Sequence, residues 1–203
     1  MGTTPDQLDQ IAILHEKGLL PFPAAIADFG AQQFHTGQHE DFARFARHFG
    51  KTVGDLPPAG PQFFTGTLFT QLGFRYVSFD VIDAPFVRRF DLNTDRVPWR
   101  FKGAFDLVLN FGTTEHVMNQ FNAFRVIHDL CREGGLIYSF FVQEGCNGHG
   151  IVHYTDAFLR HLIAANRYEV IWESRHNQPP DKCTWIILKK TSNRAFQPIV
   201  DVE

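Results

Sequence analysis

The chain has 203 residues, of which 44% are apolar and 20% charged, and its formal net charge is −3. This is the composition of a soluble globular protein, and the length suits one α/β domain with a full core. No basic excess points to nucleic acid, and the apolar runs are too short to cross a membrane. The N-terminus MGTTPDQLDQ lacks the features of a signal peptide, so we expect a cytoplasmic protein. We expect it to bind neither nucleic acid nor a membrane.

Three cysteines, Cys131, Cys146 and Cys183, are odd in number and far apart in the sequence. This spacing argues against a disulfide framework and against a zinc knuckle, and indicates reduced thiols.

Segments of helical and extended apolar pattern alternate along the chain. The first helix follows Thr4-Pro5-Asp6, with threonine as N-cap and proline as first helical residue, and Gly18 marks its end. We expect residues 1–20 to cover one edge or one mouth of a sheet. Further helices are predicted at 39–49, 62–73, 117–131 and 155–165, and strands at 24–28, 75–81, 86–91, 106–109, 136–142, 168–173 and 184–189.

The last two strands are separated by residues 177–182, which resemble a hairpin connection, so they are predicted to be antiparallel neighbours. The polar residues 191–203 read as a loose tail. The whole pattern predicts a Rossmann-like, doubly wound, seven-stranded α/β sheet, mostly parallel with an antiparallel last strand and helices on both faces. Residues 1–203 are expected to form a single domain.

The stretch FDLVLNFGTTEH, residues 105–116, joins a buried strand to a polar turn. Its strand is closed by Asn110, Phe111 and Gly112, and Thr113 then stands as the N-cap of a helix. Two interpretations follow: a well-capped helix, or a ligand at a strand-to-helix turn.

Acids also stand at the ends of other predicted strands. Asp28 is followed by Phe29-Gly30, Asp80 ends the second strand, and Asp91-Leu92-Asn93 follows the third. Because the carboxyl ends of parallel strands meet at one edge of a sheet, a ligand site is expected there.

These residues, in this order and spacing, resemble class I S-adenosylmethionine-dependent methyltransferases of the small-molecule or natural-product type. The resemblance is carried by 27–31 (ADFGA), Asp80, 91–93, 105–108 with 115–117, and 132–136 (REGGL), and it covers residues 11–190. It implies S-adenosylmethionine as cofactor and a methyltransferase-like domain that transfers a methyl group to a small molecule. The oligomeric state stays open, with a homodimer among the alternatives.

The resemblance also implies a role for each cofactor residue. Gly30 lets the backbone approach the methionine part and Asp28 lies near its amino group, while Asp80 accepts both ribose hydroxyls. The adenine is flanked by Asp91 and Leu92. The remaining expected contacts are Gln32, Val81 and the floor under the methyl group formed by Asn110, Phe111 and Gly112.

One departure concerns the first motif. The family's Gly-x-Gly-x-Gly is replaced after Gly30 by Ala31, Gln32, Gln33 and Phe34. The glutamine side chains either substitute for backbone contacts or fill the pocket.

Methyl transfer is an in-line displacement, and an oxygen or carbon acid would profit from a general base. His149 and His153 follow the fifth strand and His116 follows the fourth, so these three histidines are the candidates, His149 first. Each has the alternative role of a surface or helix-capping residue.

Two histidine pairs, His149 with His153 and His35 with His39, have the spacing of helical metal ligands. Neither has the glutamate of an H-E-x-x-H helix, and we predict no metal.

The 22 phenylalanines include several outside clear core strands, which either line an apolar pocket or belong to the core: Phe29, Phe34, Phe63, Phe64, Phe111, Phe140 and Phe141.

Two rival functions remain. One is a methyltransferase-like binding or scaffold protein without catalysis, favoured by the altered glycine motif. The other is a nucleotide-binding oxidoreductase, which would require a G-x-G-x-x-G turn that the chain lacks.

Overall fold

The computed structural model describes residues 2–198, the side chain of residue 147 excepted. By its internal contacts the chain divides into two compact units, Met1–Phe90 and Asp91–Glu203. The expectation that residues 1–203 form a single domain stays a prediction.

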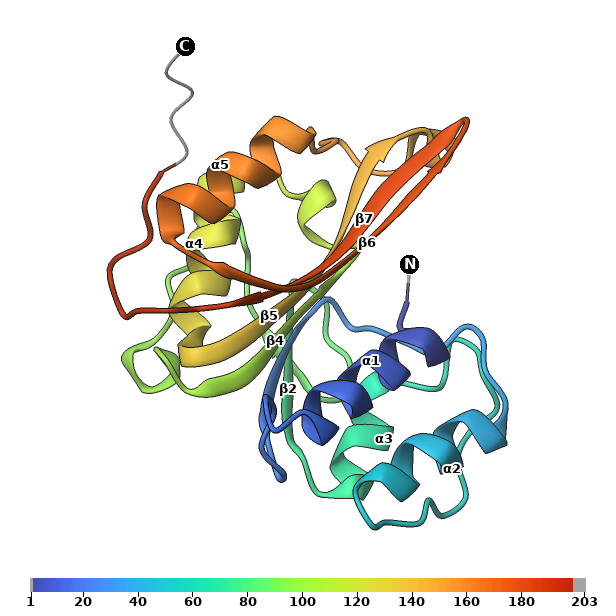
Figure 1. Ribbon diagram of the computed structural model, residues 1–203. Coiled ribbons are helices and arrows are strands. Elements are labelled where there is room, and N and C mark those ends of the chain that lie inside the picture. Colours follow the sequence, from blue (N-terminus) through green and yellow to red (C-terminus); the bar gives the residue numbers. More distant parts are fainter. Residues whose placement is uncertain (1, 199–203) are drawn as a thin grey trace. The chain divides into compact units, whose positions relative to one another are not determined.

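The first unit contains three strands and three helices in an α/β arrangement. Its strands are in the order β3-β2-β1, and both neighbouring pairs are parallel. The elements, coloured blue to green in Figure 1, lie close to their predicted positions: α1 Pro5–Glu16, β1 Ala25–Phe29, α2 His39–His48, α3 Thr65–Leu72, β2 Arg75–Asp80 and β3 Val87–Arg89.

Phenylalanine rings form much of the core of this unit. The rings of Phe34, Phe42 and Phe63 stand 4.9 Å apart in each pair, and all three side chains are buried. Helix α3 packs on β2, where the ring of Phe69 stacks on that of Tyr76. Such aromatic pairs add to the stabilisation that comes from burying their area.

The second unit contains four strands in the order β4-β5-β7-β6. Strands β4 and β5 are parallel, and β7 is antiparallel to both β5 and β6, which confirms the predicted hairpin and antiparallel last strand. Its elements are η1 Trp99–Phe101, β4 Phe105–Phe111, η2 Thr114–His116, α4 Gln120–Leu130, β5 Cys131–Glu144, η3 Cys146–Gly148, α5 Asp156–Asn166, β6 Glu169–Gln178 and β7 Asp181–Lys189.

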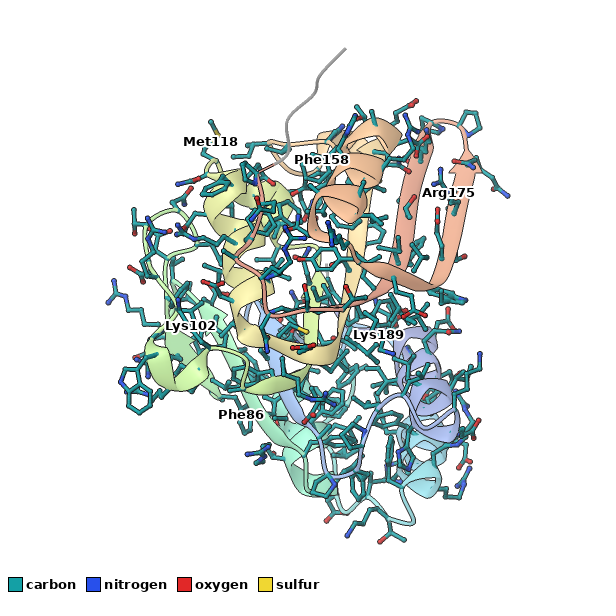
Figure 2. The ribbon with its side chains drawn as sticks, turned by 60° about the vertical axis from the view of Figure 1, so that its left-hand side comes forward. Phe86, Lys102, Met118, Phe158, Arg175 and Lys189 are labelled. Carbon is teal, nitrogen blue, oxygen red and sulfur yellow. The ribbon has the colours of Figure 1, made fainter. Side chains whose placement is uncertain are left out.

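Helices α4 and α5 cover one face of the strands of the second unit (Figure 1). The ring of Phe158 on α5 (labelled in Figure 2) lies 5.2 Å from that of Phe124 on α4, and Phe124 stacks on Phe141 of β5. At the outer end of the sheet, Arg175 of β6 pairs with Asp156, the first residue of α5 (Figure 2). Ile137, Ser139 and Phe141, alternate residues of β5, line a small cavity together with residues of α4 and α5, so both helices pack on the same side of this strand.

The predicted loose tail is wrong for its described part. Residue Arg194 accepts a hydrogen bond at its carbonyl from His128, and the Gln197 amide donates to Asn166 Oδ1 at 2.8 Å. Phe196 is buried among these contacts. Hydrogen bonds to buried side chains of α4 and α5 hold this polar segment, and residues 199–203 lie outside the described part.

The helix predicted at 117–131, with Thr113 as its expected N-cap, begins three residues later. Residues 114–116 form a single 3-10 turn, Val117 is extended, and α4 starts at Gln120. The N-cap is Asn119, whose side chain accepts from the Asn122 amide at 3.1 Å. Thr113 therefore does not cap the helix.

Candidate functional site

In the first unit, β1 and β2 are parallel neighbours, and the acid that ends β2 contacts the turn that follows β1. Gly30 adopts a φ of +87°, which favours glycine, and its amide donates to the Phe79 carbonyl. The Ala31 amide donates to Asp80 Oδ2 at 2.8 Å, while Oδ1 of the same carboxylate accepts from Val81 at 2.6 Å. Asp80 is thus fixed beside the glycine turn, and it is partly exposed to solvent.

The chain beyond this turn does not enter a helix at once. The side chain of Gln32 is buried and donates to the Phe29 carbonyl at 2.9 Å. Gln33 and Phe34 then form isolated bridges with Phe64 and Thr3, respectively, and α2 begins only at His39. The altered glycine motif therefore corresponds to an extended segment.

Asp28, in β1, is fully buried. The Tyr76 hydroxyl donates to its Oδ2 at 2.7 Å, whereas its Oδ1 has no hydrogen-bond partner among the described residues. Burial raises the pKa of Asp28 well above its usual value, and the hydrogen bond from Tyr76 opposes that shift only in part. Burial therefore shifts the ionisation of Asp28 toward its neutral form.

In the second unit, Asp91 and Leu92 open a turn that asparagine side chains hold against the start of α4. Asp91 Oδ1 accepts from the Asn93 amide at 2.8 Å. Asn119 donates to the Asn93 carbonyl and Asn122 donates to the Leu92 carbonyl, each at 2.8 Å. Leu92 is buried, and Asn119 and Asn122 were not singled out from the sequence.

The end of β4 fixes the turn that follows it. Asn110 is buried and donates from Nδ2 to Thr114 Oγ1 at 3.0 Å. Gln120 donates to the Thr114 carbonyl at 2.7 Å, and its Oε1 accepts from the Tyr154 hydroxyl at 2.8 Å. Phe111 and Gly112 are also buried, and Gly112 has a φ of +77°. Glu115, the residue after Thr114, lies on the same turn, but none of these hydrogen bonds involves its side chain.

Glu115 and the three candidate histidines form one cluster in the second unit. The Nε2 atoms of His116 and His149 are 3.1 Å apart, and His149 Nε2 lies 3.5 Å from Glu115 Oε1. His153 joins through its Nε2, which is 3.1 Å from the His149 carbonyl oxygen. The fold therefore brings together all three histidines that the sequence nominated, together with an acid that it did not.

Burial dominates the charge balance of this cluster. Glu115 has no exposed surface, and neither of its carboxylate oxygens has a hydrogen-bond partner among the described residues. Burial raises the pKa of Glu115, and it lowers the pKa of His149, which the neighbouring His116 and His153 lower further. His116 is exposed and His149 is partly exposed, so the cluster opens to solvent on its histidine side.

The loop after β5 packs against Glu115. The amides of Ile151 and Val152 both donate to the Glu115 carbonyl, at 2.8 and 3.1 Å. Gly150 lies so close that a Cβ there would stand 2.8 Å from Glu115 Cγ, and its φ is +83°. Glycine is therefore required at this position by both space and backbone conformation.

An apolar cavity of about 430 Å³ lies in the second unit. None of the phenylalanines that the sequence offered for a pocket lines this cavity. Six of them are buried in the core and Phe64 is half-buried: Phe29, Phe34, Phe63, Phe111, Phe140 and Phe141 are the buried ones. The walls of the cavity come from α4, α5 and the C-terminal segment, and Gln120 links it to the turn that carries Glu115: Gln120, Phe121, Phe124, Phe158, Phe196 and Pro198.

The sequence matches no family model and no curated protein. Solved structures do match, over about nine tenths of the chain. They show that the chain has the fold of the class I S-adenosylmethionine-dependent methyltransferases, which confirms the predicted fold class. None of the helices in residues 2–198 has the length and apolar composition needed to cross a membrane.

Three of these structures illustrate the range. A 1,6-didemethyltoxoflavin-N1-methyltransferase from Burkholderia thailandensis, solved with 1,6-didemethyltoxoflavin and S-adenosylhomocysteine, is 16% identical, with 91% of this chain and 78% of that chain covered and a TM-score of 0.55. An S-adenosylmethionine-dependent methyltransferase from Mesorhizobium loti is 13% identical, with coverage of 90% and 99% and a TM-score of 0.53. The cyclase SpnF is 12% identical, with coverage of 92% and 81% and a TM-score of 0.55. The same fold thus carries methyl transfer and a different activity, so function must be argued from the site.

Proposed function

We propose that the protein is an S-adenosylmethionine-dependent methyltransferase that acts on a small, largely apolar molecule. The observation that carries this proposal is the position of Asp80, a partly exposed carboxylate fixed beside the Gly30 turn at the ends of β1 and β2. The fold, shared with methyltransferases solved with S-adenosylhomocysteine, gives that carboxylate its expected partner.

The groups of the first unit fit the cofactor. A ribose diol needs an acceptor-only group, and a carboxylate offers about four lone pairs, so the amides of Ala31, Val81 and Ile82 leave Asp80 able to accept further. The backbone at Gly30 carries no Cβ that would hinder approach to the methionine part. In this proposal Asp28, Gln32 and Val81 border the same cofactor, and the expected cofactor contacts of Asp91, Leu92, Asn110, Phe111 and Gly112 stay predictions.

When bound, the cofactor supplies an electrophilic sulfonium methyl group. The chain's own task is to hold the acceptor in line with it and to exclude water. The apolar cavity between α4, α5 and the C-terminal segment has a volume suited to a small ligand, and Gln120 offers it a polar group. In this proposal the cluster of His149, His116 and His153 removes the proton from the acceptor. The pKa of His149 is lowered, which favours the neutral imidazole that a general base requires.

Calorimetric titration with S-adenosylmethionine and S-adenosylhomocysteine tests the cofactor site. We expect micromolar binding to the wild type, a loss of at least about tenfold in Asp80→Asn, because one carboxylate oxygen becomes a donor, and no change in Asp83→Asn. Asp83 is an exposed neighbour and serves as the matched control.

The extended segment after Gly30 favours a second candidate, a methyltransferase-like binding protein without catalysis. Gln32 is packed against the end of β1, where the family has a further glycine. Absence of heat with both ligands, in protein shown by mass spectrometry to carry neither, would favour this candidate over the enzyme.

A further inference from the structure

Glu115 is a buried carboxylate whose surroundings do not explain it. Its side chain has no exposed surface, and among the described residues no donor bonds either oxygen. An ionised carboxylate without hydrogen bonds is costly to bury, so such groups are usually protonated, paired or bound to a cation. The His149 imidazole faces Glu115 Oε1, with its Nε2 at 3.5 Å.

The spacing of the three side chains matches that of ligands around one metal ion. Ligand atoms from Glu115, His116 and His149 all lie within 4.8 Å of one another, with 3.1 Å between the two Nε2 atoms. Bonds of roughly 2.0–2.2 Å place neighbouring ligands about 3.0–3.5 Å apart in octahedral or tetrahedral geometry. The two shortest separations, 3.1 and 3.5 Å, fall in that range.

We propose that Glu115, His116 and His149 bind a divalent transition-metal ion, with Glu115 as the buried ligand and the two histidines as ligands near the surface. Two imidazoles and one carboxylate suit zinc, iron, cobalt or nickel better than magnesium or calcium, which prefer oxygen ligands. The ion would neutralise a carboxylate whose oxygens have no hydrogen-bond partner in residues 2–198.

The surroundings hold these ligands in place. Asn110 and Gln120 bond Thr114 on the N-terminal side of Glu115, and the amides of Ile151 and Val152 bond the Glu115 carbonyl. Outer-shell contacts of this kind orient metal ligands. Three protein ligands would leave coordination positions open, and the exposure of His116 and the partial exposure of His149 give solvent access to these ligands. Such an open site is typical of metals that bind a substrate rather than of purely structural metals.

This assignment replaces the expectation of no metal, which considered only histidine pairs spaced four apart. It is also an alternative to His149 as general base, because a nitrogen that binds a metal cannot take a proton. It does not depend on the proposed methyl transfer, since every ligand lies in the second unit and the ion binds without S-adenosylmethionine.

The test is titration of chelator-treated full-length protein with Co²⁺, followed by visible absorption, and with Zn²⁺, followed by calorimetry. We expect one ion per chain, with the d–d bands of a nitrogen- and oxygen-ligated cobalt. Glu115→Gln and His149→Gln should each weaken binding by more than the roughly 10–100-fold that losing an outer-shell partner costs.

His153→Gln is the matched control, because glutamine can still donate to the His149 carbonyl although the ring is lost. It should retain one ion with affinity within about threefold of the wild type. Circular dichroism identifies a variant that fails to fold. If Glu115→Gln or His149→Gln does so, metal binding by the other of these two variants tests the proposal. Absence of binding in folded wild type, or equal weakening in His153→Gln and both ligand variants, would overturn the proposal and leave Glu115 as a neutral buried acid.

Discussion

A single buried acid, Asp28, gives the first unit a pH-dependent stability. Its folded pKa lies above the unfolded value, so the neutral form is favoured in the folded protein. The stability that this group contributes is fully present below its unfolded pKa, near 3.9, and is lost as the pH rises through the folded pKa. Asp28→Asn removes the ionisation but keeps an oxygen that accepts from Tyr76.

We therefore expect Asp28→Asn to stabilise the protein at pH 8 relative to the wild type, with little difference at pH 4. Between the two pKa values the gap should grow by about 1.4 kcal/mol per pH unit. Denaturant unfolding across this pH range measures it, with the exposed Asp83→Asn as reference. A gap that is constant with pH would show that Asp28 does not titrate in the expected way.

Two glycines in the loop after β5 allow a comparison of space with backbone conformation. Gly148 and Gly150 both have positive φ, but a Cβ at Gly148 meets open space, whereas one at Gly150 would collide with Glu115. Gly148→Ala should cost roughly 1–2 kcal/mol from strain alone, and Gly150→Ala at least about 1 kcal/mol more. Urea unfolding of the two variants measures both costs. Equal costs would mean that the loop yields without disturbing Glu115.

At the scale of elements, the N-cap residues of α4 and α5 differ in the contacts that they make. Thr155 Oγ1 accepts from the Phe158 amide and caps α5, whereas Asn119 caps α4 and also bonds Asn93. Replacing a cap by alanine typically costs about 1 kcal/mol. We expect Thr155→Ala to cost about that much and Asn119→Ala about 1 kcal/mol more, because the turn at Asp91 is released as well. Denaturant unfolding of both variants provides the comparison, and a smaller cost for Asn119→Ala would contradict the role given to the Asn93 contacts.

The elements themselves were largely predictable because their signals are local. Threonine and proline marked the start of α1, and the apolar run 136–142 marked β5. The start of α4 was misplaced because Asn110 takes the Thr114 amide by a contact that no helix-capping rule includes. The proximity of His149 to Glu115 and His116 was also beyond the sequence, since it depends on how the loop after β5 folds back over the end of β4.

For the whole molecule, the fold class followed from the alternation of elements and was confirmed, whereas the chemistry depends on groups that pattern alone does not place. Asp80 was identified by its position at a strand end, a rule that holds for many sheets of this kind. Glu115 resembled an ordinary first-turn acid, and only its burial and the absence of a hydrogen-bond partner in the described part of the chain set it apart. The phenylalanine-lined cavity involves the C-terminal segment, whose polar composition suggested no packing role.

Thermal unfolding of the whole chain separates the two ligand proposals. A ligand that binds only the folded state adds about 2.7 kcal/mol at one hundred times its dissociation constant, which for about 200 residues raises Tm by roughly 5–10 °C. We expect S-adenosylhomocysteine to produce such a shift in the wild type and in Glu115→Gln but not in Asp80→Asn. Zn²⁺ should produce one in the wild type and in Asp80→Asn but not in Glu115→Gln. Loss of both shifts in either variant, with an unchanged ligand-free Tm, would mean that the two sites are coupled, because independent sites lose only the stabilisation of the ligand whose contact was removed.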